Sequence, residues 1–191
     1  MRISSDWRIY SMGPNNKPAA VVNCGDTVVF ETRDCYDGMV VSAVDEENMI
    51  DQGRINPATG PVYVKGAEPG DTLKIEIIKI KLGSKGIMRI SPNFGVLKDR
   101  VSKSLFKLVD VYDGKIHFNE RWTIPVKPMI GVIGTSPLAE TVENESPGDH
   151  GGNMDARIIG EGSVVYLPVN IPGGMLAIGD VHASMGDGEI S

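Results

Sequence analysis

Two of the three histidines lie in glycine-rich loops that also carry acidic side chains. His150 belongs to the segment PGDHGGNMD, residues 147–155, where three glycines leave the backbone around it unhindered. His182 belongs to GDVHASMGDGE, residues 179–189, and follows Asp180 by two residues, so that on a strand both side chains would point to the same face. Imidazole nitrogens and carboxylate oxygens are ligands of hard and borderline divalent metals. The two loops therefore predict a metal site.

A simpler interpretation of these loops is structural. Asp-Gly and Gly-Asp pairs are common in tight turns, so one acidic loop is weak evidence of a metal site. Two acidic loops that each carry a histidine strengthen the functional interpretation without excluding the structural one. The third histidine, His117, has no carboxylate cluster near it in the sequence. We expect it to be an ordinary histidine on a strand.

Other hydrolytic chemistries fit the sequence less well. The nucleophile elbow G-x-S-x-G of serine hydrolases is absent, as are the phosphate-binding loop and the dinucleotide fingerprint. A cysteine nucleophile would be Cys24 or Cys35. Cys35 directly follows Asp34, and a nearby carboxylate raises the pKa of a thiol. We therefore expect Cys35 to be a small thiol beside the site rather than its nucleophile.

Composition narrows the class of protein further. The 191 residues, enough for one domain, carry a formal net charge of −6 with no basic stripe, which argues against a nucleic-acid partner. No apolar run approaches the ~20 residues that a membrane-spanning helix needs. The N-terminal segment lacks the apolar region and the cleavage site of a signal peptide. These features predict a soluble, cytoplasmic protein with no membrane partner, in which both cysteines are free thiols.

The elements that position these residues are predicted to be short strands. There are 23 glycines and 12 prolines, and they divide the chain into strand-sized pieces rich in valine and isoleucine. Helical patterns are weak, with one turn at Asp45–Met49 and a loose repeat over Leu97–Leu108. We expect a mainly β fold of two layers packed as a sandwich. The predicted strands are Ala19–Cys24, Thr27–Thr32, Pro61–Lys65, Thr72–Leu82, Lys115–Phe118, Met129–Gly134, Ala156–Ile159, Ser163–Pro168 and Met175–Ala183.

Five segments, in this order, resemble the signature blocks of the acetamidase/formamidase family. They are TRDCYDG (residues 32–38), NPATGPVYVKGAEPGDTL (56–73), PMIGVIGTSP (128–137), PGDHGGNMD (147–155) and LPVNIPGGMLAIGDVHASMGDGE (167–189). The resemblance covers nearly the whole chain. It implies a β-sandwich core with some α/β elaboration, and hydrolysis of formamide, acetamide or a similar small amide to the acid and ammonia.

One departure from the family concerns length. Members of the family continue well past the GDGE block, whereas this chain stops at Ser191. We interpret residues 1–191 as a single acetamidase/formamidase-like domain that lacks the C-terminal part of the family's chain. A β fold without its last strands exposes unpaired edges. We therefore expect homo-oligomer formation, or association with the missing part as a separate chain.

The two histidine loops and the resemblance lead to a site hypothesis. In this hypothesis the site binds a divalent metal ion, expected to be zinc, and one coordination position of the metal is left for water. The predicted ligands are His150, His182, Asp34 and Asp180. The predicted catalytic groups are Glu189 as general base, Asp187 as the alternative base, and Asn153 as a donor to the developing oxyanion. Two rival functions remain: a β-sandwich subunit that binds a metal or ligand without turnover, and a metallohydrolase of cyclic amides or esters.

Overall fold

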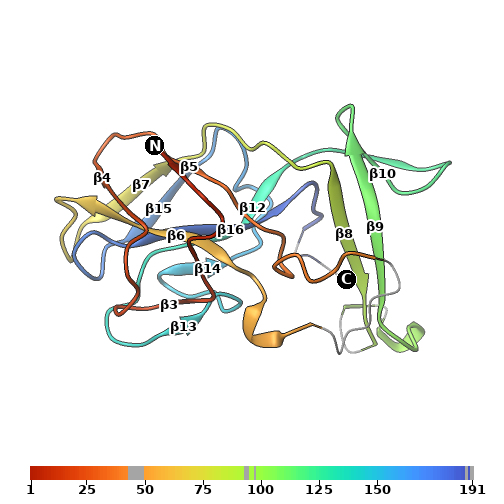
Figure 1. Ribbon diagram of the computed structural model, residues 1–191, viewed down its shortest axis with the longest axis horizontal. Helices are drawn as coiled ribbons and strands as arrows, with labels where there is room; N and C mark the ends of the chain where they lie inside the picture. Colours follow the sequence, from red (N-terminus) through yellow and green to blue (C-terminus); the bar gives the residue numbers. More distant parts are fainter. Residues whose placement is uncertain (43–49, 93–94, 97, 188, 190–191) are drawn as a thin grey trace.

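The structure, a computed structural model, describes residues 1–42, 50–92, 95–96, 98–187 and 189. It consists of short β-strands joined by turns and extended segments (Figure 1). The mainly β prediction is confirmed. No α-helix occurs within the described ranges, so the helical elaboration expected from the family resemblance is not found there.

The elements are bounded as follows. The strands are β1 (Arg2–Ile3), β2 (Arg8–Ile9), β3 (Ser11–Met12), β4 (Ala20–Asn23), β5 (Val29–Phe30), β6 (Ala58–Lys65), β7 (Thr72–Glu76), β8 (Lys85–Ile90), β9 (Leu105–Tyr112), β10 (Lys115–His117), β11 (Thr123–Pro125), β12 (Met129–Gly134), β13 (Val142–Glu143), β14 (Gly151–Asn153), β15 (Val164–Pro168) and β16 (Leu176–His182). Two 3-10 turns are η2 (Gln52–Arg54) and η3 (Lys98–Arg100).

A six-stranded sheet forms the centre of the molecule. Its order is β14–β12–β16–β6–β2, with β4 also paired to β6. β12 is antiparallel to both of its neighbours, and Val132 pairs with Asn153 of β14 and with Gly179 of β16. All six residues of β12 are buried, as expected for a short apolar run at the middle of a sheet. β12 thereby holds the strands of the two histidine-bearing segments on either side of itself.

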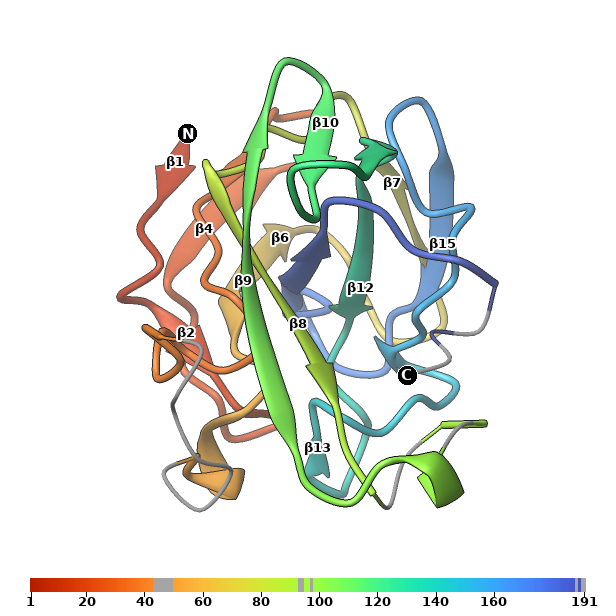
Figure 2. The same cartoon turned by 90° about the vertical axis from the view of Figure 1, so that its right-hand side faces the viewer.

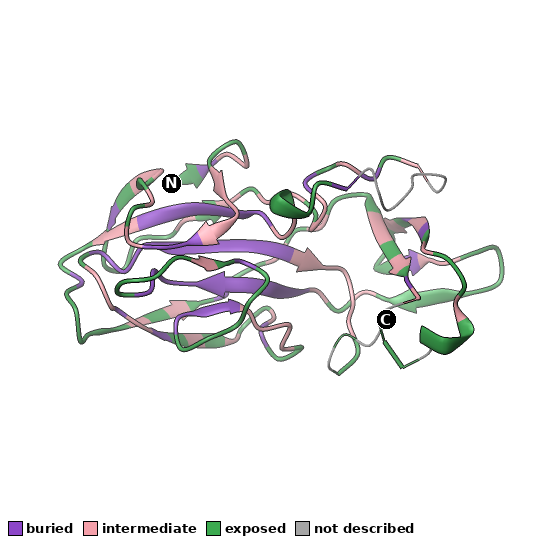
Figure 3. Cartoon of the chain, turned by 90° about the horizontal axis from the view of Figure 1, so that it is seen from below, coloured by how far each residue is buried: buried purple, intermediate pink, exposed green. Residues whose placement is uncertain are grey.

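Apolar side chains cover both faces of the central sheet. On one face Ile133 and Ile178 pack with Leu167 of the β7–β15 pair. On the other face Val132 packs with Met12 of the β3–β13 pair. Ile133 and Val132 are consecutive and therefore point to opposite faces. The buried strands lie between more exposed layers, as Figure 3 shows.

A second sheet stands beside this body. It is antiparallel, with the order β11–β10–β9–β8, and it forms the right-hand part of Figure 1 and the front of Figure 2. Phe106 of β9 packs against Val40 and Ile50, which attaches the sheet to the loop between β5 and β6. A cleft of about 2710 Å³ separates the two parts and is lined by residues of β7, β8, β9 and β16.

Three predicted elements differ from the structure. The predicted strand Thr72–Leu82 ends as β7 at Glu76, where its partner β15 begins at Val164. Ile77 still bonds to the preceding turn, donating to the Ser163 carbonyl at 3.0 Å and accepting from the Gly162 N–H at 2.7 Å. The segment Ala156–Ile159 is a turn closed by a bond from the Ile159 N–H to the Ala156 carbonyl, 2.8 Å. The loose helical repeat predicted over Leu97–Leu108 is wrong, since Lys98–Arg100 form the 3-10 turn η3 and Leu105–Leu108 belong to β9.

Two further findings concern helices. The helical turn predicted at Asp45–Met49 lies outside the described residues. Nowhere in the described chain is there a helix with the length and hydropathy that crossing a membrane requires.

Candidate active site

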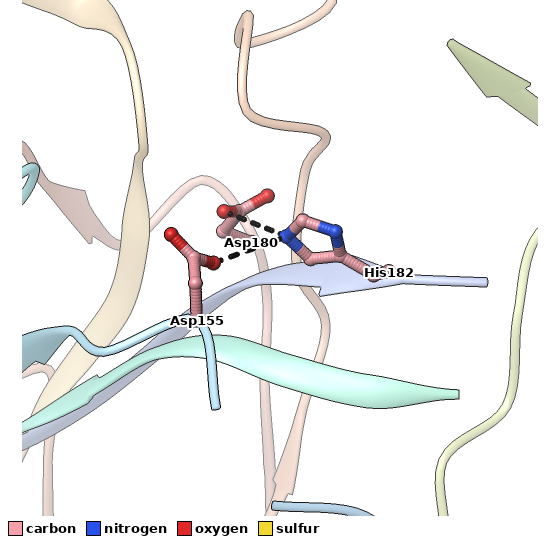
Figure 4. Close-up of side chains that lie close together, drawn as sticks. All are labelled: Asp155, Asp180 and His182. Atoms are coloured by element: carbon pink, nitrogen blue, oxygen red, sulfur yellow. Dashed lines mark hydrogen bonds and ion pairs between the residues drawn. The ribbon is translucent and has the colours of Figure 1, made fainter. Parts of the chain in front are cut away.

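Two side chains of β16, Asp180 and His182, meet Asp155, which follows β14 on the other side of β12 (Figure 4). Nε2 of His182 lies 3.1 Å from Oδ2 of Asp180 and 3.4 Å from Oδ1 of Asp155. The three side chains are between 9% and 16% exposed. Two carboxylates thus face the same ring nitrogen in a largely enclosed place.

The sheet register explains why these residues meet. Asp180 and His182 are two residues apart at the end of β16 and share a face, as predicted. Asp155 follows β14 on the other side of β12. The N–H groups of Met154 and Asp155 both point to the carbonyl oxygen of Gly131, at 3.0 and 3.4 Å. These bonds tie Asp155 to the middle of β12, opposite the β16 residues.

The backbone of the site is left-handed at each acidic residue. φ is 41° at Asp155, 46° at Asp180 and 43° at Glu189. This conformation is uncommon for residues other than glycine and costs on the order of 1 kcal/mol at each position, although aspartate tolerates it better than most residues. Unfavourable backbone of this kind is concentrated at functional sites. Its position here is a second, independent indication that the cluster is functional.

His182 is held as a cation by its two partners. Burial alone would lower the pKa of His182, but its contacts with Asp155 and Asp180 outweigh burial and raise that pKa to about 10. Burial likewise would raise the pKa of Asp155, yet the contact with His182 holds it below its ordinary value. At neutral pH the group is therefore an imidazolium between two carboxylates.

Glu189 adds a third carboxyl group. Desolvation of this carboxyl and the negative charge of Asp155 raise the pKa of Glu189 to about 7. A carboxyl with this pKa exchanges protons readily at neutral pH, which is what a general acid–base requires. Asn153 also interacts with the Asp155 side chain and lowers its pKa. The structure thus brings both Glu189 and Asn153 to the site, with Asn153 as a neighbour of Asp155.

The donor set suits a divalent metal ion. One ligand atom from each of Asp155, Asp180 and His182 lies within 4.8 Å of the others. Oδ1 of Asp155 is buried and lacks a well-aligned hydrogen-bond donor among the described residues. Imidazole nitrogen and carboxylate oxygen are both ligand types that zinc accepts. A metal bound here would take the place of the proton on His182, because a ligating imidazole is neutral.

His150 does not join this group. It precedes Gly151, which pairs with Gly134, whereas His182 pairs with Met129 at the other end of β12. Five residues along a strand correspond to about 16 Å. The His150 ring is buried beside a separate cavity of about 380 Å³, and this burial lowers its pKa. The two histidines predicted to bind one metal are therefore at opposite ends of the strand that joins their loops.

Asp155 is the site residue that the sequence interpretation missed. It is the last residue of the segment 147–155, and its residue type does not distinguish it from Asp149 in the same segment. The available signal was alternation, since Asp155 follows Asn153 by two residues just as His182 follows Asp180.

Two other predicted residues lie outside the cluster. Oδ1 of Asp34 accepts bonds from the N–H groups of Tyr36, at 2.9 Å, and Gly38, at 3.2 Å, so this carboxylate closes its own turn. Asp187 forms an ion pair of 2.9 Å with Arg157, and its side chain is 83% exposed. Neither residue belongs to the group of ligand atoms around His182.

The site opens into the cleft between the two parts of the molecule. Asp180, His182 and Glu189 line the cleft wall together with Cys35. Burial, followed by the negative charges of Asp180, Asp34 and Glu189, raises the pKa of Cys35 well above its ordinary value. Cys35 is therefore a neutral thiol at pH 7, and its position agrees with the prediction of a thiol beside the site.

Comparison with known proteins shows which family this chain resembles. The sequence model of the acetamidase/formamidase family matches residues 11–146 and 139–191. An acetamidase from Bacillus halodurans has a solved structure with 44% identity and a TM-score of 0.97, covering 100% of this chain and 64% of its own. A structure described as a predicted acetamidase/formamidase from Thermoanaerobacter tengcongensis has 46% identity and a TM-score of 0.96, covering 99% and 63%. The formamidase of Methylophilus methylotrophus is 26% identical over 93% of this chain.

These relatives are longer proteins. The chain spans 58% of the formamidase and less than two thirds of either solved chain. Within that span the fold agrees with the two solved structures over 100% and 99% of this chain. The chain belongs to the acetamidase/formamidase family.

Proposed function

We propose that this chain carries the hydrolytic centre of an amidohydrolase that converts a small linear amide, formamide or acetamide, to the carboxylic acid and ammonia. The observation that supports the proposal is the convergence of Asp155, Asp180 and His182 beside Glu189, at the wall of an open cleft. The names of the relatives agree with this reaction class.

The proposed cofactor is one divalent metal, zinc by preference, held by Asp155, Asp180 and His182. This set replaces His150 and Asp34 of the original hypothesis by Asp155, for the geometric reasons given above. When bound, such an ion supplies Lewis-acid activation of the amide carbonyl or of the attacking water.

The proton transfers fall to Glu189. Its carboxylate accepts a proton from the attacking water, and the resulting acid returns that proton to the amine as the C–N bond breaks. The pKa of Glu189, raised to about 7 in the metal-free protein, supports a group that both accepts and returns a proton. Asn153 interacts with the Asp155 side chain and helps to hold it in place.

The test measures ammonia release from formamide and acetamide by the purified chain. It is run as prepared, after chelation, and after zinc is restored. Glu189→Gln is expected to bind zinc normally and lose activity about 10²–10⁴-fold, the usual contribution of a general base. Asp187→Asn is the matched control, since it removes one negative charge from the same loop at an exposed side chain. Chelator-resistant activity, or full activity in Glu189→Gln, would overturn the mechanism.

The same assay separates the rival functions. Zinc-loaded protein that releases no ammonia would indicate a binding subunit. Faster turnover of a lactam or an ester than of formamide would indicate a different metallohydrolase.

Association with further polypeptide, most simply other copies of this chain, is part of the proposal. Its support is exposed apolar surface, for example Val41, Ile78 and Trp122, which are 74%, 67% and 68% exposed. Light scattering tests it, and a monomer at all concentrations would refute it.

A further inference from the structure

Gly131 lies at the centre of the site and has no part in the proposed chemistry. It is the third residue of β12, between the register pairs Ile130–Val181 and Val132–Gly179. This register places Gly131 opposite Asp180. Its carbonyl oxygen accepts hydrogen bonds from the N–H groups of Met154 and Asp155.

The space beside Gly131 is filled by the carboxylates of the site. A Cβ on Gly131 would lie 2.6 Å from Oδ1 of Asp155, 2.8 Å from Oδ2 of Asp180 and 3.0 Å from the Asp180 carbonyl oxygen. These two carboxylate oxygens are the ones that face Nε2 of His182. The missing side chain is thus what allows both oxygens to converge on one point.

The backbone offers no other reason for glycine at this position. Many glycines of the chain have a left-handed φ, which other residues adopt with difficulty, but Gly131 is not among them. In a buried strand such a glycine otherwise weakens the sheet, because it contributes no side chain to the core.

The type of clash also separates Gly131 from its neighbours. A Cβ on Gly151 would meet the Ile133 carbonyl oxygen at 2.2 Å, and one on Gly179 would meet the Pro57 carbonyl oxygen at 2.1 Å. Those atoms are backbone and cannot move away. At Gly131 the two closest atoms are ends of side chains, which can rotate away while the fold remains.

We propose that Gly131 is a positioning residue of the site: the absence of a side chain there holds the Asp155 and Asp180 oxygens close enough to bind one cation together with His182. The inference rests on the proposed metal function. It states that the absence of a side chain at Gly131 sets the spacing of the two carboxylate ligands. Gly131→Ala pushes the two carboxylates apart without replacing any ligand.

The experiment is calorimetric titration of zinc into three metal-free proteins: the wild type, Gly131→Ala and Gly83→Ala. Gly83 is the control, because its φ is not left-handed and a Cβ there meets no atom within 4 Å. Gly131→Ala is expected to bind zinc about 10–100-fold more weakly, the usual effect of disturbing the support of a metal ligand. Gly83→Ala should bind as the wild type does, and circular dichroism should show both variants folded. Equal zinc affinity in Gly131→Ala and the wild type overturns the proposal.

A second measurement needs neither metal nor activity. The change in stability caused by Gly131→Ala is measured by urea unfolding in the wild type and in Asp155→Gly, which removes the nearest carboxylate and relieves the left-handed φ. If Gly131 acts through this carboxylate, the substitution is less destabilising in the Asp155→Gly background. An equal effect in both backgrounds refutes the inference. The wild type could fail to bind zinc while Gly131→Ala is still less destabilising in the Asp155→Gly background. That result overturns the metal proposal and leaves the contact between Gly131 and Asp155 supported.

Discussion

The proton on His182 gives the metal proposal its sharpest quantitative consequence. In the metal-free protein the pKa of His182 is raised to about 10 by Asp155 and Asp180. A metal must displace this proton, so at pH 7 the apparent affinity is about a thousandfold weaker than that of the deprotonated site, one factor of ten for each pH unit below the pKa. The affinity is therefore expected to rise about tenfold per pH unit from pH 7 to 9.

A second proton contributes at lower pH. The pKa of Glu189 is raised to about 7, in part by the negative charge of Asp155. A cation bound to Asp155 screens this charge and lowers the pKa of Glu189, so binding below pH 7 also releases part of the Glu189 proton. The number of protons released for each zinc ion bound should therefore rise from about one at pH 8 toward two at pH 6, and the zinc affinity should depend more steeply on pH in the lower range.

Isothermal titration of zinc in two buffers of different ionisation enthalpy measures these protons directly. At pH 8 about one proton per zinc is expected, and Glu189→Gln should retain it while losing the additional release near pH 6. A zinc affinity that is constant between pH 7 and 9, with no proton released, would refute the assignment of His182 as a ligand.

Three further predictions follow from individual residues. Activity of the zinc-loaded protein should rise with pH through an inflection below 7 as Glu189 becomes the base, because the bound cation lowers its pKa from about 7, and a pH–rate profile with no inflection in the acid range would remove Glu189 from that role. Asp37→Asn should destabilise the protein by about 2–4 kcal/mol in urea unfolding, because a fully buried carboxylate that binds Arg8 and Arg54 is lost. This carboxylate has a lowered pKa, so its contribution is present above about pH 4 and disappears as the pH falls below it; an unchanged midpoint at pH 7 would contradict the account. His150→Ala should keep zinc affinity while lowering stability by about 1–3 kcal/mol, and loss of zinc with the fold intact would restore His150 to the ligand set.

The sequence predicted the type of fold well because strand length is a local property. Glycine and proline punctuation with valine- and isoleucine-rich pieces locates Met129–Gly134 as β12 with the correct bounds. The errors arise where pairing decides the structure. Residues 77–82 have strand-like composition, but the backbone pairing ends after Ile77 bonds to Gly162 and Ser163 in the turn before β15. The last four residues of the predicted helical repeat, Leu105–Leu108, belong to β9, where Phe106 packs against Val40 and Ile50.

The site was predictable in part for the same reason. Asp180 and His182 lie on one strand, so alternation places them together, and Glu189 follows them closely in the chain. His150 and Asp155 lie five residues apart in one segment, and the sequence does not say which of them reaches His182. The antiparallel register of β12 with both neighbours makes that choice, and this register depends on pairing between segments distant in sequence.

The position of the site in the sheet explains why its acidic residues have unfavourable backbone conformations and crowded side chains. Asp155 and Asp180 take left-handed backbone, and both crowd the space above Gly131. The buried β12 core on either side, with Val132 and Ile133 fully buried, supplies the rigidity that keeps these strained residues in place. The buried strand β12 thus supports the strained residues beside it, and Gly131 leaves open the space in which the oxygens of Asp155 and Asp180 lie.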